Sequence, residues 1–249
     1  PLEPNFVSVT SGAGGSTRER THKTIRNIIK KTNLKPASHL TCVGATKGEI
    51  EKIAKNYWHL GVKHIVALRG DLPPGYQHVE DGYKYADQLV AALKKIANFE
   101  ISVAGYPEKH PEAKNLNEDI DNLCRKVDAG ADRIITQFFF DNNKFYEYLN
   151  LIEKKQIKIP VIPGILPIVN FKQMVKFAKL CGTNVPKKFF SLFDDKFTDA
   201  TSKELLAAHI AIKQCEDLMQ NNINNFHFYT LNRAELTYVI FHILKNLRN

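Results

Sequence analysis

Short apolar segments alternate along the chain with longer segments in which apolar residues recur every three or four positions. The short segments are rich in β-branched residues, which is typical of strands. Residues 65–68 are apolar throughout, as in a strand buried on both faces. The predicted strands are residues 6–10, 38–43, 65–68, 101–106, 133–137, 160–165 and 226–231.

The longer segments carry helix signals in addition to the helical period. Ser16 with Glu19 and Thr46 with Glu49 form capping boxes, and Gly130 stands where a helix C-cap is expected. Two helices are therefore predicted to begin at these boxes. Further helices are predicted at the C-terminus and over residues 83–97, 116–129, 143–154, 171–181 and 202–219.

This strict alternation of strands and helices predicts an α/β protein with a parallel sheet and right-handed crossovers. Seven repeats in 249 residues suit a barrel better than an open sheet, but a parallel barrel of this class has eight strands. We therefore expect a (β/α)8 TIM barrel whose first strand is missing from this chain. Residues 1–249 are expected to form a single catalytic barrel domain.

The composition supports one domain with a large core, since 43% of the residues are hydrophobic. No apolar run approaches the ~20 residues of a membrane span, and the N-terminus lacks the pattern of a signal peptide. Four widely spaced cysteines form no Cys-x-x-Cys pair, which favours reduced thiols over disulfides or a zinc site. A cytoplasmic protein without membrane contact is therefore expected.

The formal net charge of +9 indicates anionic ligands. The lysines are scattered over the predicted helices, and the chain lacks the dense basic tract that is typical of a nucleic-acid-binding surface. We therefore expect no nucleic-acid partner, but a basic surface that accommodates phosphates or carboxylates. The glycine-rich residues 11–15 are only a weak match to a dinucleotide-binding fingerprint, because Thr17 stands where the third glycine should be.

Candidate chemistry gathers where the predicted strands end, since the carboxyl ends of barrel strands meet at one mouth. Arg69, Gly70 and Asp71 directly follow the buried run; an ion pair that closes a turn is the alternative interpretation. The other ends present polar and aromatic residues, namely Thr10, His39, Tyr106, Gln137, the Pro163-Gly164 corner and Arg233. The spacings predict no metal site, catalytic triad or carboxylate pair. Such a mouth suits a large planar ligand that supplies the chemistry itself.

The helix predicted over residues 116–129 has a polar face. Asp119, Asn122 and Lys126 are three and four positions apart, and Arg125 lies beside them. The basic pair could neutralise a pyrophosphate, and an ordinary solvated helix face is the alternative interpretation.

Six longer motifs resemble the bacterial methylenetetrahydrofolate reductases, in the same order and over essentially the whole chain. They are His-Leu-Thr-Cys at 39–42, Arg-Gly-Asp-Leu-Pro-Pro-Gly at 69–75, Tyr-Pro-Glu-x-His-Pro-Glu-Ala at 106–113, Thr-Gln-Phe-Phe-Phe-Asp at 136–141, Pro-Gly-Ile-Leu-Pro at 163–167 and Phe-His-Phe-Tyr-Thr-Leu-Asn-Arg at 226–233. That family consists of flavin-bearing (β/α)8 barrels, which agrees with the fold expected from the pattern.

The resemblance implies an FAD-dependent enzyme that uses NAD(P)H to reduce 5,10-methylenetetrahydrofolate to 5-methyltetrahydrofolate. The two substrates would take turns on one face of the flavin, which gives ping-pong kinetics. Hydride would pass from the nicotinamide to flavin N5, and then to the methylene carbon of an opened iminium form of the folate. The family also implies a homo-oligomer, and short chains without a regulatory domain resemble the NADH users.

The resemblance also implies roles for individual residues. Asp71 would lie between flavin and pterin as a catalytic residue, because its carboxylate disfavours an anionic reduced flavin and favours a cationic iminium. Gln137 and Gln173 would hydrogen-bond the pterin or the nicotinamide amide, and Phe177 would stack on either substrate. Arg233 would hold a folate carboxylate. The implied FAD contacts are Thr10, His39, Arg69, Gly70, Asp71, Tyr85, Ala86, Tyr106, His110, Ala113, Asp119, Asn122, Arg125 and Lys126.

One family feature has no counterpart in the sequence. The family's first strand carries a Glu before Phe-Phe-Pro-Pro that serves as general acid, and nothing before Phe6 matches it. The alternative to the reductase is therefore an impaired flavin- or folate-binding barrel that lacks this acid. Another flavin barrel, such as a proline-dehydrogenase-like enzyme, is disfavoured by the residues 137–140 and by Arg233.

Overall fold

The computed structural model describes residues 2–10, 18–72, 75–194 and 199–247. In these residues seven strands form one sheet, in the order in which they occur along the chain. The pairs β1–β2, β2–β3, β3–β4 and β6–β7 are parallel. The strands are β1 (Val7–Val9), β2 (Pro36–Thr41), β3 (His64–Leu68), β4 (Glu100–Gly105), β5 (Arg133–Phe138), β6 (Val161–Ile165) and β7 (His227–Phe228).

Helices connect the strands, as a parallel sheet requires. They are α1 (Arg18–Lys31), α2 (Lys47–His59), α3 (Ala86–Ile96), α4 (Leu116–Asp128), α5 (Asn142–Lys154), α6 (Phe171–Cys181), α7 (Lys187–Leu192), α8 (Ala200–Gln220) and α9 (Glu235–Asn246). The structure confirms the predicted fold class, an α/β fold of the TIM-barrel type with seven strands in the described residues.

Beyond shifts of one or two residues at the ends of elements, the predicted elements differ from the structure in three places. Three helices, α6, α7 and α8, lie between β6 and β7, so the predicted strict alternation is wrong there. The strand predicted over residues 226–231 is only two residues long, His227–Phe228, and the chain has left the extended conformation at Leu231 and Asn232, whose φ angles are 51° and 61°. The helix predicted from residue 83 begins at Ala86, since Tyr85 is still extended and serves as its N-cap.

The chain divides into two compact units. Apart from residues 1 and 2, the first unit consists of Glu3–Ala104 with Asp121–Ile134, and the second of Gly105–Ile120 with Ile135–Asn249. The prediction of a single catalytic domain is not tested by this division and stays a prediction.

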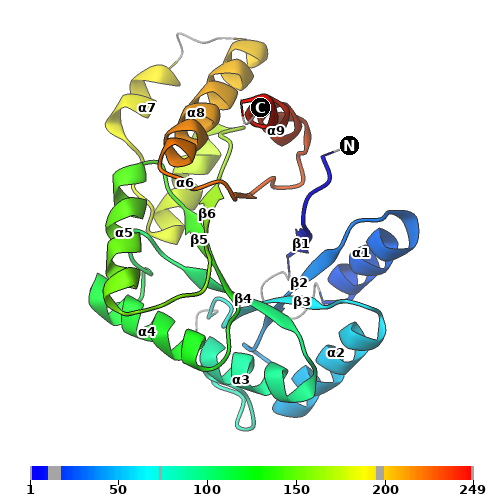
Figure 1. Cartoon of the computed structure of the whole chain (residues 1–249). Coiled ribbons are helices and arrows are strands. Elements are labelled where there is room, and N and C mark those ends of the chain that lie inside the picture. Colours follow the sequence, from blue (N-terminus) through cyan, green and yellow to red (C-terminus); the bar gives the residue numbers. More distant parts are fainter. Residues whose placement is uncertain (1, 11–17, 73–74, 195–198, 248–249) are drawn as a thin grey trace. The chain divides into compact units, whose positions relative to one another are not determined.

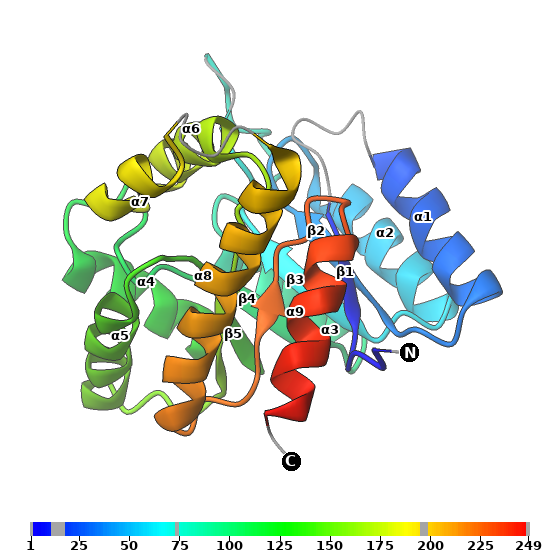
Figure 2. The ribbon, with the colours of Figure 1, turned by 90° about the horizontal axis from the view of Figure 1, so that it is seen from above.

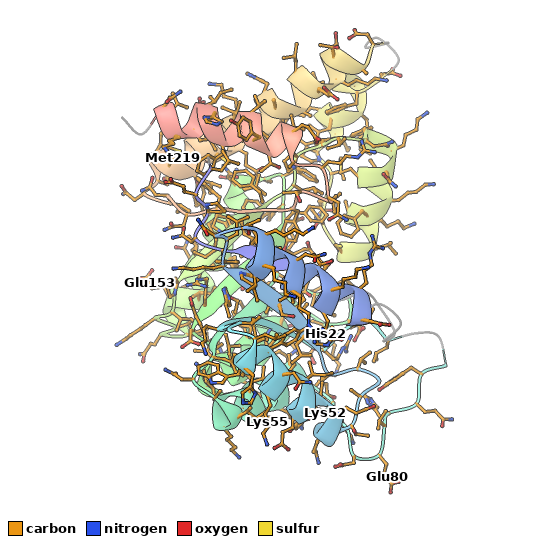
Figure 3. The ribbon with its side chains drawn as sticks, turned by 90° about the vertical axis from the view of Figure 1, so that its right-hand side faces the viewer. His22, Lys52, Lys55, Glu80, Glu153 and Met219 are labelled. Carbon is orange, nitrogen blue, oxygen red and sulfur yellow. The ribbon has the colours of Figure 1, made fainter. Side chains whose placement is uncertain are left out.

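The first unit has an aliphatic core beneath helices. Figure 1 shows α1, α2 and α3 on the same side of strands β1 to β4. The fully buried side chains include Ile50 from α2, Ile65 from β3 and Leu93 from α3. His22 of α1 contacts the ring of Tyr57 on α2, with 4.7 Å between centroids; His22 is labelled in Figure 3. Apolar faces of neighbouring helices thus close over the strands.

Local signals behave as predicted in the first unit. The Thr46–Glu49 capping box is present, since the Thr46 side chain accepts from Glu49 N and the Glu49 carboxylate accepts from Thr46 N. Gly130 follows α4 with a φ of 109°, which only glycine adopts readily. The Ser16–Glu19 box and the glycine-rich residues 11–15 involve positions outside the described residues.

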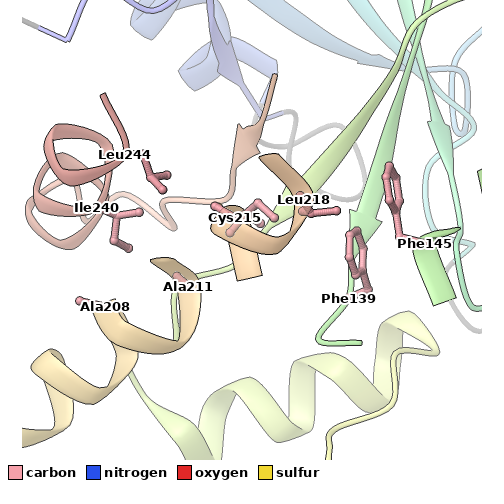
Figure 4. Packing of buried hydrophobic residues seen from close by; sticks show 9 residues of the cluster. Phe139, Phe145, Ala208, Ala211, Cys215, Leu218, Ile240 and Leu244 are labelled. Carbon is pink, nitrogen blue, oxygen red and sulfur yellow. The ribbon is translucent and has the colours of Figure 1, made fainter. Parts of the chain in front are cut away.

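The core of the second unit contains phenylalanine rings among aliphatic side chains. Phe139 and Phe145 stack with 5.0 Å between centroids, next to a cluster from α8 and α9 that includes Cys215, Leu218 and Ile240 (Figure 4). Helices α8 and α9 lie side by side (Figure 2) and pack against each other. A neighbouring cluster is formed by Phe138, Leu166, Ile168, Met174, Ala178, Phe189 and Ala207. Helix α7, which the sequence pattern did not predict, contributes Phe189 to it.

None of the helices in the described residues combines the length and the apolar character that a membrane span needs.

Candidate functional site

In the first unit, the backbone that follows β3 is held by the end of β2. Cys42 N donates to Leu68 O (3.2 Å) and Val43 N to Arg69 O (2.9 Å), so the pairing of the two strands continues beyond them. Gly70 then turns with a φ of +92°, and a Cβ at this position would lie 3.1 Å from Thr41 Cβ. A glycine is therefore needed between Arg69 and Asp71.

The side chains around this turn differ in exposure. Arg69 is partly buried and donates from Nε to Gly70 O (3.2 Å), whereas Asp71 is exposed. His39 is partly buried on β2, where its Cα pairs with that of Val66. Thr10 follows β1, and its carbonyl accepts from Thr21 Oγ1 (2.9 Å). In the first unit, these four predicted residues lie on the strands or just after them.

Helix α4 brings a cation to the carboxyl end of β4. Lys126 Nζ donates to Ala104 O (2.6 Å), and Arg125 donates to Asn122 Oδ1. Lys126 is partly buried, so this part of α4 is more than an ordinary solvated face; Arg125 is exposed. Tyr85 is 60% exposed at the start of α3, with Ala86 next to it.

In the second unit, the loop after β4 is organised by a buried carboxylate. Asp119 is 5% exposed and accepts from His110 N (2.9 Å). His110 Nδ1 accepts from Glu112 N (3.1 Å), and the His110 ring meets Tyr106 edge-on, with 4.7 Å between centroids. Asp119, His110 and Tyr106 are therefore brought together. Ala113 N donates to His110 O (3.0 Å) and closes the same turn.

The same loop has a contact that the sequence analysis missed. Glu108 accepts two hydrogen bonds from Asn184, one from the backbone N–H (3.1 Å) and one from the side-chain amide. Burial raises the pKa of the Glu108 carboxyl, against the opposing effect of the Asn184 hydrogen bonds. Glu108 belongs to a conspicuous motif, but no local signal pairs it with a residue 76 positions further along the chain.

The end of β5 carries Gln137, which is partly buried, and its Oε1 accepts from Phe138 N (3.1 Å). Phe138 stacks on Phe177 of α6 with 5.2 Å between ring centroids. Thr183, just after α6, donates from Oγ1 to Phe138 O (2.9 Å). The structure thus brings Gln137 and Phe177 to the same part of the second unit.

Gln173 and Phe177 lie one helical turn apart on α6, hence on one face. Asn170 caps the helix by accepting from Gln173 N (2.9 Å), and the Gln173 side chain is exposed. Phe177 is partly buried against the core of the second unit, so it is in part the core residue that its spacing alone predicts. Arg233 is exposed, in a turn where its N–H donates to Thr230 O (2.9 Å).

The described residues contain no group of three or more His, Cys, Asp or Glu side chains that could hold a metal ion. The groups at the strand ends are instead cations, amides, an exposed carboxylate and aromatic rings. Fold and residues together define a protein of the TIM-barrel class that presents polar, charged and aromatic groups where its parallel strands end.

Comparison with known proteins narrows this class. The family model described as Methylenetetrahydrofolate reductase matches residues 1–245. The chain is 49% identical to the 5,10-methylenetetrahydrofolate reductase of Escherichia coli (strain K12), over 98% of this chain and 81% of that protein. It is 46% identical to the enzyme of the same name from Buchnera aphidicola subsp. Acyrthosiphon pisum, over 98% and 82%. The chain belongs to the methylenetetrahydrofolate reductase family, which confirms the resemblance of its motifs.

A solved structure supports the fold. A protein from Clostridium thermocellum, described as binding two copies of 5-methyl-5,6,7,8-tetrahydrofolic acid, has a TM-score of 0.55 over 97% of this chain and 93% of its own. The identity is 13%, so this likeness concerns the fold alone.

Proposed function

We propose that this chain reduces 5,10-methylenetetrahydrofolate to 5-methyltetrahydrofolate with NAD(P)H and bound FAD, by a ping-pong reaction. The observation that carries the proposal is the family membership, over almost the whole chain. It is supported in each unit by the placement of residues with the required chemistry at or beyond the strand ends. We also propose, from the family alone, a single catalytic domain in a cytoplasmic homo-oligomer.

The donor set of the first unit fits FAD. A flavin dinucleotide carries a pyrophosphate, and Arg69, Arg125 and Lys126 are cations that pair well with phosphate oxygens. Lys126 supports this assignment, because its ammonium reaches the carboxyl end of β4 while most surface lysines extend into solvent. His39, Thr10, Gly70 and Asn122 would add neutral hydrogen-bonding groups, and Tyr85 and Ala86 would add contact surface.

The loop after β4 in the second unit would also hold FAD. The Asp119 carboxylate fixes the His110 backbone, and His110 in turn fixes Ala113. Tyr106 and His110 would contact the cofactor with their rings. In this proposal Asp119 acts by shaping the loop as well as by any direct contact.

FAD, when bound, would supply a carrier that accepts a hydride from NAD(P)H and gives it to the folate. Asp71 would act electrostatically on this exchange. Its carboxylate is exposed beyond Gly70 and would disfavour further negative charge nearby while stabilising a positively charged folate. Asp71 is therefore the proposed catalytic residue of this chain.

The second unit would orient the two substrates. Gln137 and Gln173 carry amides that can donate and accept, which suits both a pterin ring and a nicotinamide amide. Phe177 would stack on whichever planar ring is bound. Arg233, exposed in its turn, would pair with a carboxylate of the folate tail.

An anaerobic titration tests this function. The purified chain, supplied with FAD, is titrated with NADH while the visible absorption of the flavin is followed, and methylenetetrahydrofolate is then added. The proposal requires that NADH bleaches the flavin and that the folate restores its colour. Bleaching without recovery would support the impaired barrel instead, and failure of FAD to bind would overturn the assignment of the cofactor residues.

A further inference from the structure

Tyr229, the residue after β7, connects three strand ends in the second unit. Its backbone N–H donates to Ile165 O at the end of β6 (2.8 Å). Its hydroxyl donates to Thr136 O on β5 (2.9 Å). One residue therefore attaches the end of β7 to the ends of both β6 and β5.

The Tyr229 ring packs directly against Gly164 of β6, at the position that a side chain on residue 164 would occupy. A Cβ on Gly164 would lie 2.3 Å from Thr136 O and 2.6 Å from Tyr229 Cε2, so only hydrogen fits. Gly164 N in turn donates to Thr136 Oγ1 (2.9 Å). Thr136 is fully buried, and both its carbonyl and its hydroxyl take part in this contact.

The hydrogen bond to Thr136 O bears directly on Gln137. This carbonyl belongs to the peptide group between Thr136 and Gln137, so fixing the oxygen fixes the plane of the peptide from which the Gln137 side chain extends. The Tyr229 ring also meets Phe138 edge-on at 6.1 Å, and Phe138 stacks on Phe177. Tyr229 therefore supports both side chains that face the proposed substrates from β5 and α6.

Desolvation raises the pKa of the Tyr229 hydroxyl, and the neighbouring Tyr106 and Cys181 act in the same direction. The hydroxyl therefore keeps its proton at any pH at which the enzyme works, and remains a donor to Thr136 O. A group in this state orients its acceptor and does not exchange protons with a substrate.

We propose that Tyr229 is a positioning residue, which sets the orientation of Gln137 and Phe177 for the folate and nicotinamide substrates. This inference rests on the proposed function of these two residues. Tyr229 acts through Thr136 and Phe138 and needs no contact with substrate.

Tyr229→Phe tests the inference, because it removes the hydroxyl and keeps the ring. Tyr146→Phe is the matched control: its hydroxyl donates to Asp217 Oδ2 (2.6 Å) and accepts from Asn221 (3.0 Å), between α5 and α8. Both variants lose a tyrosine hydrogen bond of similar length. We expect Tyr229→Phe to raise KM for the folate by about fivefold, the size of one lost hydrogen bond, with FAD content unchanged. Tyr146→Phe should leave KM at the wild-type value.

A double-mutant cycle shows whether the effect passes through Gln137. In a Gln137→Ala background, adding Tyr229→Phe should change KM by less than twofold, because the side chain that it orients is already gone. Equal KM values for Tyr229→Phe and Tyr146→Phe would overturn the inference. So would an undiminished fivefold effect in the Gln137→Ala background.

Failure of the proposed function would be seen separately, as absence of turnover in the wild-type chain. The inference can then be tested without turnover, by the NMR chemical shift of the Gln137 side-chain amide. The resonance is assigned by its disappearance in the Gln137→Ala variant. A shift that moves in Tyr229→Phe and stays in Tyr146→Phe supports the positioning role. An unmoved shift in Tyr229→Phe overturns it.

Discussion

The two units support their candidate residues in different ways. In the first, aliphatic side chains such as Ile65 and Leu93 are buried in the core, and the candidate groups include the charged Arg69, Asp71 and Lys126. In the second, phenylalanine rings join aliphatic side chains in the core, and the candidate groups of β5 and α6 are neutral amides and a phenyl ring. This contrast agrees with the proposal that cations of the first unit bind the pyrophosphate of FAD and that neutral groups of the second unit bind planar substrates.

The two units also differ in the interactions that hold their candidate residues in position. The first unit relies on strand pairing that continues past β2 and β3, together with one glycine turn. The second relies on side-chain contacts between strands, in which Thr136, Gly164 and Tyr229 fit together without spare volume. Backbone pairing tolerates changes of side chain, whereas tightly packed side chains do not.

The largest effect is expected from Gly164→Ala. The added methyl would overlap Thr136 O and Tyr229, so β5 and β6 must separate; we expect a loss of about 3 kcal/mol or more in the free energy of unfolding. Gly48→Ala on α2 is the matched control, since nothing lies within 4 Å of its Cβ and alanine favours helices. Urea denaturation measures both. A Gly164→Ala midpoint equal to that of the wild type would contradict tight packing in the second unit.

His227 predicts a pH dependence for the second unit. Burial lowers its pKa from 6.5 to about 4, so below pH 6.5 the unfolded chain takes up a proton that the folded chain does not. Stability should therefore fall as the pH drops from 6.5 to 4, by about 3 kcal/mol, and level off below that range.

Removing the imidazole should flatten this part of the curve. Unfolding of His227→Gln, followed from pH 4 to 7, is compared with that of His209→Gln, which replaces an exposed histidine of α8. His209→Gln should retain the wild-type slope. If the His227→Gln slope were as steep as that of the wild type, another group would be responsible.

A smaller effect is expected at the charges of the first unit. Lys126→Met should weaken FAD binding by about tenfold, because a charge-assisted hydrogen bond to phosphate is lost, while Gln137→Ala should leave FAD affinity unchanged. Lys52→Met, on the exposed face of α2 (Figure 3), is the control for total charge. Titration by FAD fluorescence gives the affinities. Equal FAD affinities for Lys126→Met and Lys52→Met would contradict the proposed role of Lys126 in binding the cofactor.

The last comparison concerns thiol reactivity, which has no effect on stability or on FAD binding. Burial raises the pKa of Cys42 to about 11, and its thiol donates to Arg69 O (3.6 Å). Very little thiolate forms at pH 8, so iodoacetamide should modify Cys42 far more slowly than the partly exposed Cys181 of the second unit. Peptide mass spectrometry after timed labelling measures the two rates. Faster labelling of Cys42 would mean that the end of β2 opens in solution.

Much of the fold could be predicted from the sequence, because the signals are local. Helix α6 has the predicted bounds, the Thr46–Glu49 box caps α2, and each of the seven predicted strands overlaps a strand of the sheet. Helix α7 and the shortness of β7 were missed. Both depend on packing or on backbone angles that a six-residue pattern does not reveal.

The candidate residues divide in the same way. Arg69, Gly70 and Asp71 could be identified from the sequence, because charged residues directly after a buried apolar strand are visible in the sequence pattern alone. Glu108 with Asn184, and Tyr229 with Thr136, could not be paired from the sequence, since 76 and 93 positions separate the partners.

The sequence by itself determined most of the strands and helices and the chemical character of the strand ends, because these depend on residue types at short spacing; its ordered motifs also indicated the family. Only the tertiary structure decided which neighbours hold these groups in place. The Gly164 hydrogen, the Tyr229 hydroxyl and the Thr136 carbonyl come from three strands, and their fit depends on distances that exist only after the strands have paired.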